Sequence, residues 1–212
     1  MIDENEFLKA LSMGNLKEVV RLSQDALDHG ESANSVLSCG LIKAMDQIGI
    51  KFKHNEIYIP EVLVAARAMH AGLTVLKPFI GNSASSNALR IVLGTVKGDL
   101  HDIGKNLVGM MLEGGGFEVI DIGIDVPPEK FIVVAKEQRA KVIGMSALLT
   151  TTMMQMKTTI EMIKTSGLGK DVKTIVGGAP VTLEFSTQIG SDGYASDAAS
   201  AVTKVRELLG IA

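Results

Sequence analysis

Cysteine and tryptophan are the rarest residues of this 212-residue chain: Cys39 is the single cysteine, and there is no tryptophan. One cysteine excludes an intrachain disulfide and a metal site built from several thiolates of this chain. The near absence of cysteine fits a reducing compartment, so we expect a cytoplasmic protein in which Cys39 is a small buried side chain.

Basic clusters and long apolar runs are also missing. The 21 Lys and Arg against 24 Asp and Glu give a formal net charge of −3, which argues against nucleic acid as the main partner. The start, Met1-Ile-Asp-Glu-Asn-Glu6, is acidic and predicts no signal peptide. We find no apolar run near the roughly 18 residues of a membrane span, and therefore expect no membrane partner. A hydrophobic content of 46% is instead typical of a globular chain with a sizeable core.

The first 80 residues have the hydrophobic period of helices. Asp3 with Glu6 forms a helix-start signature, and Pro60 suits the first turn of a later helix. Four amphipathic helices separated by short connections predict a four-helix bundle, which we assign to residues 1–81. Residues 82–87 are small and polar, and predict a flexible linker.

After the linker the pattern changes to short apolar runs that alternate with helical stretches. Strands are predicted at Arg90–Val96, Glu118–Ile122, Val142–Ser146, Thr174–Val176 and Gly193–Ala195. This alternation predicts an α/β domain over residues 88–212, a doubly wound five-stranded parallel sheet with the flavodoxin-like order 2-1-3-4-5. In that order the ends of strands one, three and four lie at the edge where open α/β sheets hold ligands.

The turn after the first strand contains Asp99, His101 and Gly104. A histidine two residues after a carboxylate is a candidate metal ligand, because the carboxylate can hold its other ring nitrogen. Taken singly, each residue has a simpler explanation: a turn histidine is usually a surface or capping residue, and Asp99 could serve the helix N-terminus. The polar residues after strands three and four could equally be helix caps and turn residues.

Together these residues form a composite pattern. Asp-x-His-x-x-Gly at 99–104 is followed after 41 residues (105–145) by Ser146-Ala-Leu148, and after 28 more (149–176) by Gly177-Gly178. This pattern resembles the B12-binding signature of cobalamin-dependent methyltransferases and mutases, as in the B12-binding module of methionine synthase. The N-terminal half, with Phe52 and Ile59–Met69, is similar to the bundle of small corrinoid proteins in methyltransferase and O-demethylase systems. The resemblance covers nearly the whole chain.

The resemblance implies that cobalamin binds in the base-off, His-on form, with His101 as the lower axial ligand of cobalt. Asp99, supported by Thr152, would accept a hydrogen bond from the N–H of the other ring nitrogen. The displaced nucleotide tail would occupy a slot that glycines keep open, because a Cβ would narrow it. The residues implied to contact the cofactor are Gly98, Asp99, Leu100, His101, Asp102, Ile103, Gly104, Ser146, Leu148, Leu149, Thr150, Thr152, Gly177, Gly178, Ala179, Tyr194, Ala195, Ser196 and Asp197.

The same resemblance implies that the bundle covers the upper face of the corrin. The residues implied for this cover are Phe52, Ile59, Val62 and Met69, although a place in the bundle core explains Val62 equally well. An apolar cover would keep water and oxidants from a reactive cobalt. Cob(I)alamin would take a methyl group from a donor methyltransferase, and methylcobalamin would pass it to an acceptor methyltransferase. A reductive activase is a further implied partner.

No general acid, base or nucleophile for breaking the donor bond is visible, so we expect no catalysis by this chain alone. The sequence leaves the donor open among methanol, methylamines, betaines and phenyl methyl ethers, and the acceptor open between tetrahydrofolate and a thiol. The alternatives are a B12-dependent sensor or regulator, which would need a DNA-binding module, and a mutase subunit, which normally lacks such a bundle. A response-regulator receiver would share the flavodoxin-like plan but would not explain the bundle.

Overall fold

The computed structural model describes residues 2–79 and 89–211. It divides into two compact units, one of Met1–Ala88 with Glu113–Gly116, the other of Leu89–Leu112 with Phe117–Ala212. The predicted linker, residues 82–87, lies outside the described residues.

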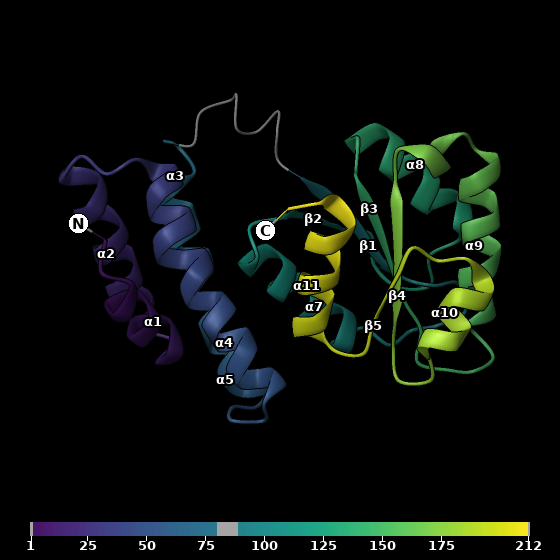
Figure 1. Cartoon of the computed structure of the whole chain (residues 1–212), viewed down its shortest axis with the longest axis horizontal. Helices are drawn as coiled ribbons and strands as arrows, with labels where there is room; N and C mark the ends of the chain where they lie inside the picture. The colour runs from purple at the N-terminus through teal and green to yellow at the C-terminus, as the bar shows by residue number, and fades with distance from the viewer. Residues whose placement is uncertain (1, 80–88, 212) are drawn as a thin grey trace. The chain divides into compact units, whose positions relative to one another are not determined.

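The first unit contains the four predicted helical segments (Figure 1). They are α1 (Glu4–Ser12), α2 (Leu16–Asp28), a continuous stretch of α3 (Ala33–Ser35), a π-helix (Val36–Ile42) and α4 (Lys43–Lys53), and α5 (Ile59–Leu76). Asp3 caps α1 by accepting hydrogen bonds from the backbone of Asn5 and Glu6. The π-helix was not predicted. It contains Gly40, where a Cβ would lie 3.0 Å from the ring of Phe7, so this glycine lets α1 pack closely.

Helix α5 corrects one expectation, because among the described residues it is long and apolar enough to span a membrane. Length and composition alone are weak support for a span, since the core helix of a bundle passes the same test. Helix α5 contacts α1, α2 and α4, and seven of its residues are buried. These contacts describe a core helix of the first unit.

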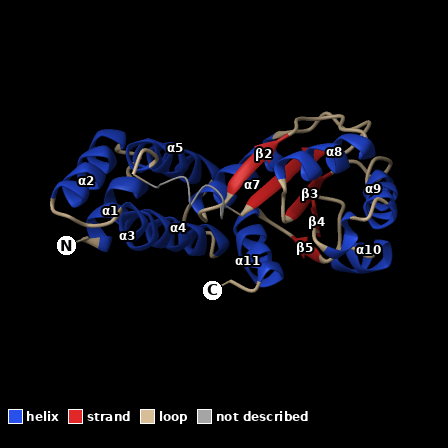
Figure 2. Cartoon of the chain, turned by 90° about the horizontal axis from the view of Figure 1, so that it is seen from above, coloured by secondary structure: helices blue, strands red, loops and turns tan. Residues whose placement is uncertain are grey.

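The second unit is a five-stranded parallel sheet in the order β2-β1-β3-β4-β5, which confirms the predicted topology. Its strands are β1 (Arg90–Thr95), β2 (Glu118–Asp121), β3 (Val142–Ser146), β4 (Lys173–Gly177) and β5 (Gly193–Ala195). Its helices are α7 (Ile103–Gly114), α8 (Pro128–Gln138), α9 (Met154–Thr165), a 3-10 turn (Leu168–Lys170), α10 (Leu183–Ile189) and α11 (Ala198–Leu209). Helices α7 and α11 cover one face of the sheet, and α8, α9 and α10 cover the other (Figures 1 and 2).

Strand β1 lies inside the sheet, between β2 and β3, and is buried on both faces. Ile91, Val92 and Leu93 are at most 4% exposed, as expected for a parallel strand between two layers of helices. The fully buried Phe131 of α8 belongs to the same core cluster as Val92 of β1 and residues of α9. Because the core holds β1 rigidly, the turn that leaves its carboxyl end starts from a fixed position.

Candidate functional site

The carboxyl ends of the central strands meet at one edge of the sheet. Thr95 of β1 pairs with Ser146 of β3, which pairs with Gly177 of β4. The loops that follow these three strands therefore leave the sheet side by side. In the order 2-1-3-4-5 the chain turns to opposite sides after β1 and β3, and ligands bind at such a switch point.

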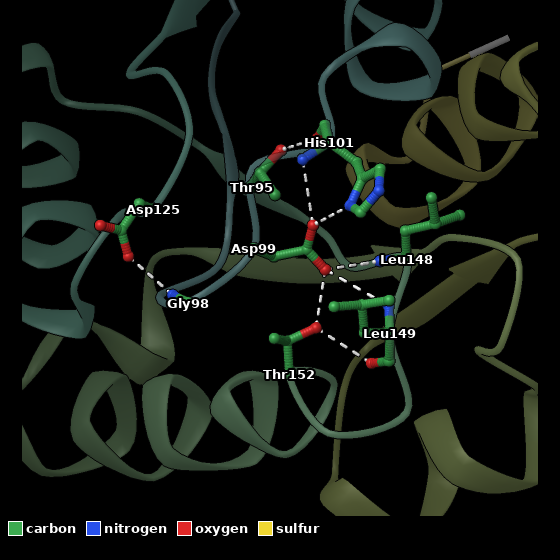
Figure 3. A network of polar contacts seen from close by, with 8 residues as sticks. All are labelled: Thr95, Gly98, Asp99, His101, Asp125, Leu148, Leu149 and Thr152. Atoms are coloured by element: carbon green, nitrogen blue, oxygen red, sulfur yellow. Dashed lines mark hydrogen bonds and ion pairs between the residues drawn. The ribbon is translucent and has the colours of Figure 1, made fainter.

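A buried carboxylate, that of Asp99, joins two of these loops (Figure 3). Its Oδ1 accepts hydrogen bonds from the backbone N–H of His101 (3.1 Å) and from the ring Nδ1 of His101 (2.8 Å). Its Oδ2 accepts from the N–H groups of Leu148 (2.8 Å) and Leu149 (3.3 Å) and from the hydroxyl of Thr152 (2.6 Å). The structure thus brings Asp99, His101 and Thr152 together, as the sequence pattern predicted.

These hydrogen bonds determine the charge of Asp99 and the tautomer of His101. Burial alone would raise the pKa of Asp99, but hydrogen bonds from Thr152, from the N–H of Leu148 and from His101 outweigh burial and hold this pKa well below its usual range. Ionised Asp99 can only accept hydrogen bonds, so Nδ1 of His101 must be the donor. In the neutral imidazole the lone pair is then on Nε2, and the His101 side chain is 52% exposed. In its neutral form His101 therefore presents Nε2 as a possible metal donor at the switch point.

Two further residues of this network were missed by the sequence analysis. The hydroxyl of Thr95 donates to the carbonyl of His101 (2.8 Å), and the carboxylate of Asp125 accepts from the N–H of Gly98 (2.7 Å). The N–H of Asp125 also donates to the carbonyl of Asp99 (2.9 Å). A polar residue in a buried strand was the available signal for Thr95. Asp125 has a φ of +50°, which local sequence does not reveal.

Large apolar side chains in the two loops that Asp99 joins are unusually exposed. Leu100, Ile103, Leu148 and Leu149 are between 42% and 77% exposed. A single exposed leucine needs no explanation, but a group of them in these two loops indicates a surface that a ligand covers.

The glycines of the site have two different roles. A Cβ on Gly104 would meet no atom within 4 Å, so this glycine borders open space, as expected for a slot. A Cβ on Gly177 would lie 2.8 Å from the carbonyl oxygen of Ala195, and one on Gly178 would lie 1.9 Å from that of Ala147. Gly178 also has a φ of +128°. The last two glycines therefore allow neighbouring loops to approach one another, which is a different reason from the one we expected.

The other predicted contact residues lie at the same edge, because Ala195 at the end of β5 pairs with Gly177. Thr150 is exposed in the loop after β3, and Ala179 is exposed in the turn after β4. Asp197 caps α11 by accepting from the N–H of Ser200 (2.8 Å), and Ser196 donates to the same carboxylate (2.9 Å). Contact of these residues with a cofactor stays a prediction.

The four residues predicted to cover a corrin belong to the first unit. Val62 and Met69 are at most 1% exposed, so their side chains present no surface in this structure. Phe52 is half-buried at the end of α4, and Ile59 is 42% exposed at the start of α5. Their role as a cover stays a prediction.

Fold and site define the class of protein: a doubly wound α/β ligand-binding domain with one carboxylate-bound imidazole at its switch point, joined to a helical unit. Two family models match, both described as a B12 binding domain, over residues 89–203 and 3–77. The chain is 46% identical over 177 residues to the dimethylamine corrinoid protein of Methanosarcina barkeri, and this alignment covers 83% of each chain.

Solved structures give the same result. A cobalamin-binding protein from Desulfitobacterium hafniense DCB-2 is 31% identical with a TM-score of 0.82, over 98% of this chain and 99% of that one. A chain of the methanol:cobalamin methyltransferase complex MtaBC from Methanosarcina barkeri is 28% identical with a TM-score of 0.83, over 97% and 78%. The chain belongs to the small corrinoid proteins of methyltransferase systems, and its cofactor is cobalamin.

Proposed function

We propose that this protein carries a methyl group from a donor methyltransferase to an acceptor methyltransferase, with cobalamin bound base-off and His101 as the lower axial ligand. The observation that carries the proposal is the hydrogen bond of 2.8 Å from Nδ1 of His101 to the buried carboxylate of Asp99. In the neutral imidazole this bond places the free lone pair on Nε2, and neutral imidazole is the form in which histidine binds metals.

The residues at the sheet edge fit the cofactor. A metal that is already held by a corrin ring needs one ligand from the protein, and His101 supplies one nitrogen. The exposed side chains of Leu100, Ile103, Leu148 and Leu149 suit the apolar parts of a large macrocycle. Open space at Gly104 suits a displaced nucleotide tail. When bound, cobalamin supplies a cobalt centre that accepts and releases the methyl group.

The protein's own contribution is orientation and electrostatics. Asp99 holds the ring of His101 in one tautomer and one rotation, and its negative charge makes Nε2 a stronger donor. Thr152 supports Asp99 through the shortest of the five hydrogen bonds, and the carbonyl of Leu149 (3.0 Å) shares the same hydroxyl proton. Thr152 thereby ties the loop after β3 to the histidine turn.

The names of the relatives guide the choice of partners. Relatives named for dimethylamine and a complex named methanol:cobalamin methyltransferase support a donor methyltransferase as partner. We propose a methylamine as the donor, with methanol, betaines and phenyl methyl ethers as the other donors to be tested. An acceptor methyltransferase that uses tetrahydrofolate or a thiol, a reductive activase, and a cytoplasmic location complete the proposal.

The helical unit is proposed to cover the upper corrin face through Phe52 and Ile59, the two of the four predicted side chains that are partly exposed. Replacing Phe52 with alanine should make the methyl-loaded protein lose its methyl group faster in light. Loss at the wild-type rate in both Phe52→Ala and Ile59→Ala would contradict this part of the proposal.

The test of the main proposal uses protein whose histidines carry ¹⁵N, loaded with cobalamin and reduced to Co(II). The EPR splitting should change with the ¹⁵N label only if a protein histidine binds cobalt. His101→Ala should abolish this label-dependent splitting, while His54→Ala, at a surface position of the first unit, should keep it. Methyl transfer is then measured with each donor and its methyltransferase. A wild-type EPR splitting that is the same with ¹⁴N and ¹⁵N histidine would refute His101 ligation. Absence of methyl transfer from every donor tested would refute methyl carriage.

A further inference from the structure

Thr95 is a polar residue in a strand that otherwise buries apolar side chains. It lies at the end of β1 and is 0% exposed, next to Val96, which is also 0% exposed. Valine has nearly the same shape as threonine, so burial alone would favour valine here. A buried hydroxyl needs a hydrogen-bond partner, and that of Thr95 donates to the backbone carbonyl of His101 at 2.8 Å.

The segment around His101 depends on such side chains, because residues 99–102 form neither helix nor strand. The main-chain groups of an irregular segment must find partners outside the regular ladders. The N–H of His101 donates to Asp99 and its carbonyl accepts from Thr95, so side chains hold both main-chain groups of the histidine. Figure 3 shows both bonds at the main chain of His101.

Thr95 itself is fixed on a rigid part of the sheet. Its N–H donates to the carbonyl of Gly123, and its carbonyl accepts from the N–H of Val126, both at 3.0 Å. Thr95 is also held by the pairing of β1 with β3, in which it lies opposite Ser146. The hydroxyl that holds His101 is therefore anchored to the most buried strand of the domain.

We propose that Thr95 is a positioning residue for His101 as the cobalt ligand, an inference that rests on the proposed function. Asp99 fixes the rotation and tautomer of the ring, whereas Thr95 fixes the main chain from which the ring extends. The nitrogen donor is thus in place before the cofactor arrives, and little conformational freedom is lost when it binds cobalt. Without the hydroxyl, residues 100–102 would adopt other conformations whenever the histidine is not bound.

The experiment compares Thr95→Val, which removes the hydroxyl and keeps the shape, with Thr95→Ser, which keeps the hydroxyl. The readout is the ratio of histidine-bound to histidine-free Co(II), from the label-dependent EPR splitting, at a temperature where the wild type shows both forms. Thr95→Val should lower this ratio by up to about fivefold, the factor for one hydrogen bond of about 1 kcal/mol. Thr95→Ser should stay within about twofold of wild type.

A matched control is available in α9. Thr159 is 1% exposed, and its hydroxyl also donates to a backbone carbonyl, that of Gln155 (2.8 Å). Thr159→Val therefore makes the same chemical change without a link to His101, and should leave the ratio unchanged. An equal fall in Thr159→Val and Thr95→Val would overturn the proposal, as would an unchanged ratio in Thr95→Val.

A second variant covers the case in which Thr95→Val does not fold. Thr95→Cys has the same heavy-atom frame as Thr95→Ser but is a weaker donor, and should therefore give a ratio below that of Thr95→Ser. A ratio equal to that of Thr95→Ser would overturn the proposal. Failure of the proposed function looks different, because wild-type protein itself would then show no histidine nitrogen on cobalt.

Discussion

Replacing Asp99 with asparagine keeps the shape of the side chain but turns one of its two acceptor atoms into a donor. The carboxylate accepts from His101 on one side and from Leu148, Leu149 and Thr152 on the other. An amide cannot satisfy both sides, because its NH₂ group meets N–H donors in either orientation.

The consequence can be worked out for each orientation. If the NH₂ group faces Leu148 and Leu149, two partly buried N–H groups lose their acceptor, and each such loss costs up to about 1–3 kcal/mol. If it faces His101, the backbone N–H is left without a partner and Nδ1 must become an acceptor. The ring proton then moves to Nε2, which removes the lone pair that a metal needs. The variant therefore loses stability, histidine ligation, or both.

The assay is thermal unfolding of the cofactor-free protein at neutral pH, followed by the Co(II) EPR spectrum of the loaded protein. A loss of about 2–4 kcal/mol lowers Tm by roughly 5–15 °C for a chain of this size. Asp3→Asn is the control, because asparagine replaces aspartate well at the N-cap of α1. A variant that melts with this control and keeps the wild-type histidine signal would refute the reasoning.

Three other changes should have distinct results. Because hydrogen bonds hold the pKa of Asp99 below its ordinary value near 4, its ionised form stabilises the fold. That stabilisation is complete above about pH 5 and declines as the pH falls further, so urea unfolding between pH 3 and 7 should show wild type and Asp99→Asn converging in acid. Gly104→Ala should keep the wild-type Tm but weaken cobalamin binding in titrations. Gly178→Ala should lower Tm, because its Cβ would clash with the carbonyl oxygen of Ala147. A lower Tm in Gly104→Ala together with a wild-type Tm in Gly178→Ala would contradict both assignments. Thr152→Val should lower Tm by a few degrees through the loss of one charge-assisted hydrogen bond, and an unchanged Tm would exclude that contribution.

The sheet could be predicted from the sequence because its signals are local. Apolar runs gave all five strands, including the short β5, and parallel strands joined by helices allow few orders. The composite pattern at 99–104, 146–148 and 177–178 also identified the edge where the site lies. Buried parallel strands and glycine turns can be predicted in this way because each has a characteristic short sequence pattern, an apolar run or a glycine at the turn.

The remainder depends on contacts between distant residues. The π-helix at Val36–Ile42 has the same local pattern as an α-helix, and Gly40 is explained only by the ring of Phe7. Thr95 looks like an ordinary strand residue until the carbonyl of His101 is placed beside it. Asp125 is similar, since its left-handed backbone and its bond to Gly98 both follow from the fold. Sequence reasoning thus found Asp99, His101 and Thr152, but not Thr95 and Asp125, which bond the main chain of the same turn.

The donors around Asp99 explain how one carboxylate can be ionised and still serve the histidine. A lysine or arginine beside Asp99 would also lower its pKa, but it would compensate the negative charge that the imidazole receives. Each of the hydrogen bonds to Asp99 found among the described residues comes from a backbone N–H, a hydroxyl or the ring of His101. Neutral donors stabilise the ionised form without adding positive charge. The full charge of Asp99 thus acts on Nδ1–H of His101, which fixes this tautomer and makes Nε2 of the neutral imidazole a stronger electron-pair donor.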